Sequence, residues 1–181
     1  MSKEEFVLSW TLDPYHTSIE FSARHMMVST VRGHFTEFSA ELEIEPEDLT
    51  RSSAKASIKA ASIDTRVAPR NDHLRSGDFF DAEKYPELTY QSRRIEALGG
   101  DRYRVEGDLT IKDVTKPVVL DVSFLGINKS PQGATVAGFE ATGKLNRSDF
   151  GLTYNAALEA GGVVIGDEIK ITIDAEANLT A

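Results

Sequence analysis

The sequence of 181 residues contains no cysteine, one tryptophan, six prolines and no long apolar run. Without cysteine there is no disulfide framework, no CxxC redox or zinc motif and no thiol nucleophile. The longest apolar runs, such as Val118–Leu120, are far too short to cross a bilayer. The N-terminal segment MSKEEFVLSWTLD carries acidic residues and lacks the apolar core of a secretory signal, so we expect a cytoplasmic protein.

Positive charge is also in deficit, because 20 lysines and arginines face 29 acidic residues and leave a net charge of −9. The excess of negative charge repels phosphate backbones and anionic lipid surfaces at long range. We therefore predict neither a nucleic-acid partner nor an integral membrane segment. The length and ordinary composition predict a single domain over residues 1–181.

Apolar and polar residues alternate along most of the chain, which is typical of strands with one packed face. The alternation is clearest over 169–179, and over 103–111 with 118–124, where we expect a hairpin with its turn at Asp113–Pro117. Weaker alternation covers 19–23, 38–44, 54–63, 88–95 and 136–145. Breakers such as Gly99-Gly100 and Gly161-Gly162 separate these runs. The pattern predicts an all-β fold of about eight antiparallel strands, in a sandwich or a barrel.

The segment 70–84 alone has helical character, and we expect one or two short helical turns there in a crossing loop. Strands about ten residues long would close into a barrel whose interior holds packed side chains or one small ligand. Small residues recur on the expected inner face: Ala54, Ala56, Ala60, Gly107, Ala137, Ala141, Gly143, Ala175 and Ala177. They either leave room for a ligand or fit the taper of a packed barrel, and the pattern leaves both interpretations open.

Two nucleotide- or metal-binding patterns are incomplete. Gly138–Lys144 resembles the start of a phosphate-binding loop, but Leu145 supplies no hydroxyl and the stretch alternates like a strand. His16, His25 and His34 are spaced by nine residues, so pairing strands could bring them together as metal ligands. The spacing matches no known ligand motif, and we predict no metal and no cofactor.

The best acid–base candidate is the Asp72-His73 pair, because a nearby carboxylate could orient the imidazole. We favour a structural interpretation, in which this polar segment fastens the crossing loop to the barrel mouth. Phe79, Phe80 and Tyr85 are likewise interpreted first as a lid buried on the barrel and second as ligand contacts.

A series of short motifs in fixed order resembles the YceI-like family over nearly the whole chain. The motifs are Trp10-x-Leu12-Asp13-Pro14-x-His16, Ile19-x-Phe21-x3-His25, Val31-Arg32-Gly33-x-Phe35-x2-Phe38, Ser62-Ile63-Asp64-Thr65, His73-Leu74-Arg75-Ser76-x-Asp78-Phe79-Phe80-Asp81, Lys84-Tyr85-Pro86, Gly107–Ile111, Val114–Val118 and Arg147-x-Asp149-Phe150-Gly151-Leu152. The resemblance implies an extended, eight-stranded antiparallel barrel, similar to lipocalins, whose core holds a long apolar chain. The ligands that it implies are polyisoprenoids, including isoprenoid quinones and prenyl pyrophosphates, and fatty-acid-like amphiphiles.

This resemblance leads to the hypothesis of a non-enzymatic protein that binds, transports or stores such a lipid. The residues expected to line the cavity are Phe21, Phe35, Phe38, Phe79, Phe80 and Tyr90, and those expected near the head group are His25, Arg70 and His73. The alternative is a stress-response enzyme that uses the Asp72-His73 region or a histidine-bound metal. A homodimer is the remaining partner prediction, and the sequence leaves it open.

Overall fold

The computed structural model describes residues 8–156, 158 and 164–180. It confirms the all-β architecture, with one helix and three short 3-10 turns among these residues. The expected breaker at Gly161-Gly162 lies outside the described residues. No helix in the described part of the chain is long and apolar enough to cross a membrane.

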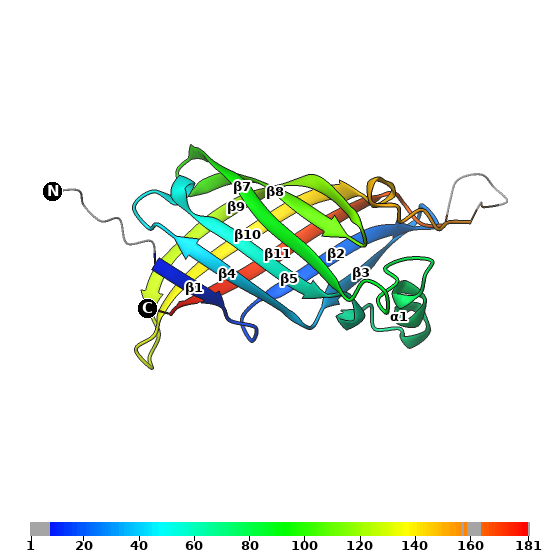
Figure 1. Ribbon diagram of the computed structural model, residues 1–181, viewed down its shortest axis with the longest axis horizontal. Coiled ribbons are helices and arrows are strands. Elements are labelled where there is room, and N and C mark those ends of the chain that lie inside the picture. Colours follow the sequence, from blue (N-terminus) through cyan, green and yellow to red (C-terminus); the bar gives the residue numbers. More distant parts are fainter. Residues whose placement is uncertain (1–7, 157, 159–163, 181) are drawn as a thin grey trace.

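Eleven strands form one antiparallel sheet that closes on itself through the pairing of β1 with β11. The strands are β1 (Leu8–Leu12), β2 (Ser18–His25), β3 (Ser29–Phe35), β4 (Phe38–Ile44), β5 (Ser53–Lys59), β6 (Ile63–Asp64), β7 (Glu87–Gly99), β8 (Arg102–Ile111), β9 (Val114–Lys129), β10 (Thr135–Asn146) and β11 (Glu168–Leu179). The result is an elongated barrel, with α1 at one end and β1 near the other (Figure 1).

The eleven strands occupy eight positions around the barrel, because three positions each hold two short strands in succession. β11 pairs with β1 near its C-terminal end and with β2 nearer its start. In the same way β3 continues into β4, since β2 pairs with β3 while β1 pairs with β4. β5 and β6 share the third position, with pairings to β4 and β3. The prediction of eight long antiparallel strands is therefore confirmed, with breaks that the alternation did not reveal.

Two predicted boundaries are wrong. The turn between β8 and β9 consists of Lys112 and Asp113, and Lys112 has a φ of +58°. Pro117 does not belong to the turn but pairs with Asp108 inside the ladder. It is tolerated because the pairing of β9 with β10 extends only to Leu120, so the proline's missing N–H costs no ladder hydrogen bond on that side. The strand expected over 54–63 ends at Lys59, where a 3-10 turn begins at Ala60.

The helix α1 (Ala68–Arg75) confirms the helical turn expected near residue 70. Pro69 suits the first turn of a helix, where its missing N–H has no intrahelical acceptor to serve. Buried Asn71 fastens the helix to the barrel, since its Oδ1 accepts hydrogen bonds from the Thr65 N–H and hydroxyl, both 2.7 Å long. Arg75 adds donations to the carbonyls of Ala61 and Ile63. The helix is thereby held over one end of the barrel.

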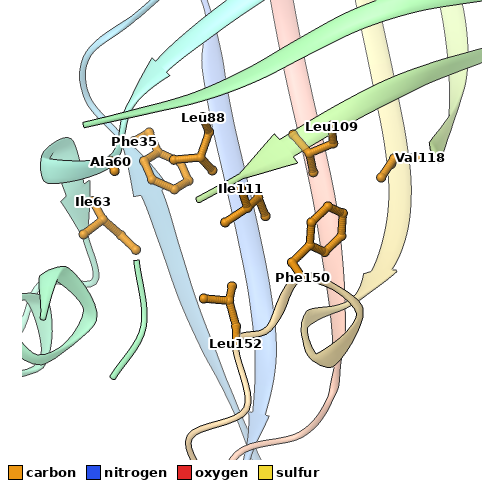
Figure 2. Packing of buried hydrophobic residues seen from close by; sticks show 9 residues of the cluster. All are labelled: Phe35, Ala60, Ile63, Leu88, Leu109, Ile111, Val118, Phe150 and Leu152. Carbon is orange, nitrogen blue, oxygen red and sulfur yellow. The ribbon is translucent and has the colours of Figure 1, made fainter. Parts of the chain in front are cut away.

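The apolar core consists of two clusters, one toward each end of the barrel. The cluster at the α1 end is shown in Figure 2 and consists of Phe35, Ala60, Ile63, Leu88, Leu109, Ile111, Val118, Phe150 and Leu152. The cluster toward the other end consists of Trp10, Ile44, Leu49, Ala137 and Ala177. Packing is therefore dense at two levels, and the cavities lie beside these clusters.

Candidate functional site

A cavity of about 410 Å³ lies inside the barrel at the α1 end. This first cavity has a volume in the range of sites for small ligands. Its lining is mostly apolar and comes from several strands, α1 and the segment after β10: Phe21, Ala23, Arg24, His25, Val31, Phe35, Thr65, Arg70, His73, Leu74, Phe79, Phe80, Leu88, Leu109, Ile111, Leu145, Arg147, Leu152, Tyr154, Val164, Ile165, Ile169 and Ile171. Such a surface suits an apolar chain.

Aromatic rings form one wall of the first cavity. The ring centres of Phe21 and Phe35 are 5.6 Å apart, and Phe80 stands edge-on to Phe35 at 6.1 Å. Because Phe80 follows α1 while the other two rings come from β2 and β3, these contacts join the crossing segment to the barrel. Offset and edge-to-face pairs at such distances stabilise a packed arrangement.

A second aromatic group involves His73, Phe79 and Tyr154. The His73 ring lies edge-on to Phe79 at 5.0 Å and to Tyr154 at 4.7 Å between centres. His73 Nε2 lies 2.8 Å from Asp78 Oδ2. Asp72, the carboxylate of the acid–base candidate considered from sequence, does not pair with His73 but with Arg75, at 3.1 Å. On α1 the side chains of adjacent residues diverge, whereas Asp78 reaches His73 from the turn that follows.

All charged residues that line the first cavity are basic, although the chain carries a net charge of −9. They are Arg24, Arg70 and Arg147, and the titratable His25 and His73 accompany them. No aspartate or glutamate belongs to the lining found among the described residues. The cavity therefore combines an apolar interior with donors suited to an anionic or hydrogen-bond-accepting group.

Arg70, predicted as a head-group residue, lines the first cavity from α1. Its Nε donates to Thr65 Oγ1 and its Nη2 to the Thr65 carbonyl, both at 2.8 Å. These two bonds fix the guanidinium, and no Nη1 bond is found within the described residues. A ligand's acceptor could therefore take the Nη1 donors without disturbing the bonds that orient the side chain.

Arg147 was missed as a site residue, although the family motif contains it. It is only 5% exposed and begins the 3-10 turn after β10. The guanidinium donates to the carbonyls of Leu152, Tyr154, Ile165 and Gly166 at 2.6–3.2 Å. Burial lowers its pKa from the ordinary arginine value. Arg147 thus ties together two segments of the cavity wall, and an isolated arginine after a strand gives no sequence signal for this role.

A second cavity of about 200 Å³ lies further along the barrel, away from α1. Its lining includes five alanines, Ala40, Ala54, Ala56, Ala141 and Ala175, and no charged residue. Four of these were among the small residues expected on the inner face. Others of that set are filled in: Ala60, Ala137 and Ala177 are buried in the packed clusters. Small residues therefore leave room at one level of the barrel and fit dense packing at others.

The structure brings together seven of the nine predicted site residues in the first cavity: Phe21, His25, Phe35, Arg70, His73, Phe79 and Phe80. Tyr90 instead lines the second cavity. Phe38 begins β4, directly after the break at Thr36 and Glu37, and lines neither cavity. No ligand contact has been observed for any of them, so their roles in binding stay predictions.

His16, His25 and His34 do not assemble into a metal site. Among the described residues, the one group of three suitable side chains consists of Asp13, His16 and Glu176. His16 Nδ1 lies 2.8 Å from Asp13 Oδ2 and 3.5 Å from Glu176 Oε2. This group lines neither interior cavity, and His34 instead lies 4.0 Å from Asp64. The histidine spacing therefore does not reflect a shared site.

Comparisons with known proteins agree with this architecture. A family model described as the YceI-like domain matches residues 10–177. A UPF0312 protein of Staphylococcus aureus strain N315 is 37% identical over 173 residues, which cover 95% of this chain and 98% of the relative.

Two solved structures share the fold. BcnA from Burkholderia cenocepacia has a TM-score of 0.80 and 26% identity, covering 91% of this chain and 98% of its own. A polyisoprenoid binding domain from Saccharophagus degradans has a TM-score of 0.67 over 95% of this chain and 99% of its own, and at 15% identity the likeness concerns the fold alone. The family match spans nearly the whole barrel, and with it the motifs quoted above are accounted for: the chain belongs to the YceI-like family.

Proposed function

We propose that the protein binds a long-chain amphiphile of the polyisoprenoid or fatty-acid type in the first cavity, and carries or stores it without changing it chemically. The observation that carries the proposal is an apolar interior space of about 410 Å³ whose charged lining residues are all basic. The ligand class is the one that membership of the family leads us to expect. Of the two candidate spaces, the first is the larger and alone has charged groups in its wall.

The apolar chain supplies most of the binding free energy. Each buried methylene contributes about 0.8 kcal/mol. Association costs several kcal/mol in lost motion, so a few isoprene units are enough for micromolar binding. The aliphatic and aromatic residues between Phe21 and Ile171 in the lining offer the surface for this burial.

The polar end of the ligand belongs near Arg24, Arg70 and His73. Thr65 holds Arg70 through two hydrogen bonds. Within the described part of the chain the Nη1 donors of Arg70 have no acceptor, so they can serve an acceptor on the ligand. Arg147, by contrast, uses its donors on four carbonyls and acts on the wall rather than on the ligand. An anionic head group therefore has a cationic partner that is already oriented.

The direct experiment is mass spectrometry of an organic extract of the purified protein, together with thermal shifts in farnesol and farnesyl pyrophosphate. We expect a co-purified lipid and a rise in Tm that grows with ligand concentration. The absence of both a bound lipid and any shift would overturn the proposal.

A matched pair of variants tests the head-group placement. Arg70→Met should weaken binding of farnesyl pyrophosphate about tenfold while farnesol binding changes little, because only the former carries an anionic head. Arg66→Met is the control, since Arg66 is exposed and does not line the cavity. Equal loss of both ligands in Arg70→Met, or equal effects in both variants, would show that the head group lies elsewhere.

The enzymatic alternative rests on His73, the histidine in the lining that has a carboxylate partner, Asp78. We propose instead that His73 helps to orient the ligand and does not act as an acid or a base. Its Nε2 faces Asp78 while its ring packs against Phe79 and Tyr154. Recovery of an unaltered prenyl lipid after incubation supports this role, and recovery of a hydrolysed or otherwise modified lipid would contradict it.

Cytoplasmic location and a homodimer stay predictions, and light scattering tests the homodimer.

A further inference from the structure

The two cavities follow one another along the same strands. On β8, Leu109 and Ile111 line the first cavity, whereas Tyr103 and Val105 line the second. On β11, Ile169 and Ile171 line the first, and Ile173 and Ala175 the second. Between these two levels, the inward-facing residue of β8 is Gly107. Because glycine has no side chain, it leaves space on the inner face between the two cavities.

The side chain of Tyr90 fills this gap. A Cβ atom added at Gly107 would lie 2.3 Å from Tyr90 Cζ, so the ring rests directly on the glycine. The hydroxyl of Tyr90 donates to the carbonyl of Val118 at 3.2 Å, and Val118 pairs with Gly107 across the next ladder. The side chain therefore starts on β7, crosses β8 over the glycine and ends on β9. A glycine within a strand often marks such a close approach.

Burial and hydrogen bonding hold the ring in this position. Desolvation is the main cause that raises the pKa of Tyr90 to about 12, so the hydroxyl stays protonated and able to donate at neutral pH. The ring also packs against the apolar cluster at the α1 end. Tyr90 belongs to the lining of the second cavity and not to that of the first.

We propose that Tyr90, resting on Gly107, separates the second cavity from the first and thereby limits the length of the apolar chain that the protein accepts. This inference rests on the proposed function of the first cavity. The alanine-lined second cavity has about half the volume of the first and carries no charge, so it suits the far end of a longer chain once the ring is removed.

The test measures the affinities of geraniol, farnesol, geranylgeraniol and solanesol for the wild-type protein and for Tyr90→Ala. In the wild type, affinity should rise with chain length until the first cavity is full and then stop rising. In Tyr90→Ala the rise should continue by at least one further alcohol, with a gain of about tenfold or more over the wild type for that alcohol, because additional methylenes become buried.

Two controls separate the ring from other effects. Tyr90→Phe keeps the ring and loses only the hydroxyl, so it should keep the chain-length limit of the wild type. Val105→Ala enlarges the second cavity while Tyr90 stays in place, and it should also keep that limit.

The outcomes are distinguishable. If the wild type binds none of the alcohols, the proposed function fails. If it binds farnesol but Tyr90→Ala shows the same length limit, the role of Tyr90 is overturned. Ala175→Leu, which narrows the second cavity and leaves Tyr90 untouched, tests the inference without relying on the folding of Tyr90→Ala. Weaker binding of long alcohols by this variant would mean that the wild-type ligand already reaches the second cavity, which also overturns the inference.

Discussion

The two ends of the barrel interior differ in what builds them. The first cavity, at the α1 end, has aromatic and aliphatic walls, three arginines and two histidines, and hydrogen bonds from Arg147 hold its wall segments together. The second cavity is lined by alanines, aliphatic residues, three aromatic rings and a few hydroxyls but by no charged residue, and it lies near a packed cluster that contains Trp10. The same alternating strands therefore enclose a site with charged groups at one level and an uncharged, mostly apolar space at another, according to which side chains point inward.

The largest loss of stability is expected at the α1 end, from Arg147→Met. It removes a buried guanidinium that serves four carbonyl oxygens, so it should lower the free energy of unfolding by about 3 kcal/mol or more. Urea denaturation followed by circular dichroism measures the change. Arg24→Met is the matched control because Arg24 is exposed and makes only longer bonds, 3.3 and 3.4 Å, to Thr30 and Met27. Equal destabilisation by both variants would contradict the special role of Arg147.

A smaller effect is expected at the other end from Trp10→Phe. Trp10 is 2% exposed, and its Nε1 has no hydrogen-bond acceptor among the described residues. Phenylalanine gives up some packing but also removes this unpaired donor, so we expect the free energy of unfolding to change by no more than about 1 kcal/mol. Trp10→Ala, which leaves a cavity, should cost about 3 kcal/mol or more in the same denaturation experiment. If Trp10→Phe costs as much as Trp10→Ala, the indole N–H has a partner that stabilises the fold.

The smallest effect concerns His16, beside the break between β1 and β2. Its hydrogen bond to Asp13 is the main cause that raises the pKa of His16, and the same bond lowers the pKa of Asp13. Protonated His16 therefore stabilises the fold below its usual pKa of 6.5, and this contribution is lost as the pH rises through the raised value. The contribution of Asp13 is present above its usual pKa and is lost as the pH falls through the lowered value.

We therefore expect the Tm of the wild type to fall relative to that of His16→Gln as the pH rises from about 6 to about 8. The difference should be small because the His16 side chain is 66% exposed. Asp13→Asn removes the partner and should abolish the same dependence. A pH profile of His16→Gln that runs parallel to the wild type would contradict the coupling.

Strand positions were the most predictable part of the molecule. The period of two over 169–179 gave β11 nearly to the residue, because one face packs and the other meets solvent along most of its length. The break between β1 and β2 coincides with the sequence breaker Asp13-Pro14. The breaks between β3 and β4 and between β5 and β6 were not predictable, since these strand ends depend on pairing with distant strands. Pro117 misled the turn assignment because its tolerance depends on where β10 stops pairing.

The candidate site was predictable in membership rather than in geometry. Seven of the nine predicted site residues line the first cavity, but the inner face of a barrel does not reveal at which level a side chain lies. Tyr90 therefore lines the second cavity instead of the first, and Asp78 was overlooked as the partner of His73. Arg147 was missed as a site residue because its acceptors are backbone carbonyls, which every sequence possesses.

The pairing that closes the barrel joins segments at opposite ends of the described chain. β11 meets β1 through three residue pairs and β2 through five, and the Thr180 hydroxyl donates to the Ser9 carbonyl across 171 residues of sequence. Such pairing closes a long loop at a cost in chain entropy, so we expect it to form late in folding. Until β11 has been synthesised, the sheet cannot close, and both cavities stay open along the edge where β11 will pair. The apolar interior is then exposed to any hydrophobic molecule in its surroundings, so a ligand present at that stage could be enclosed as the barrel closes.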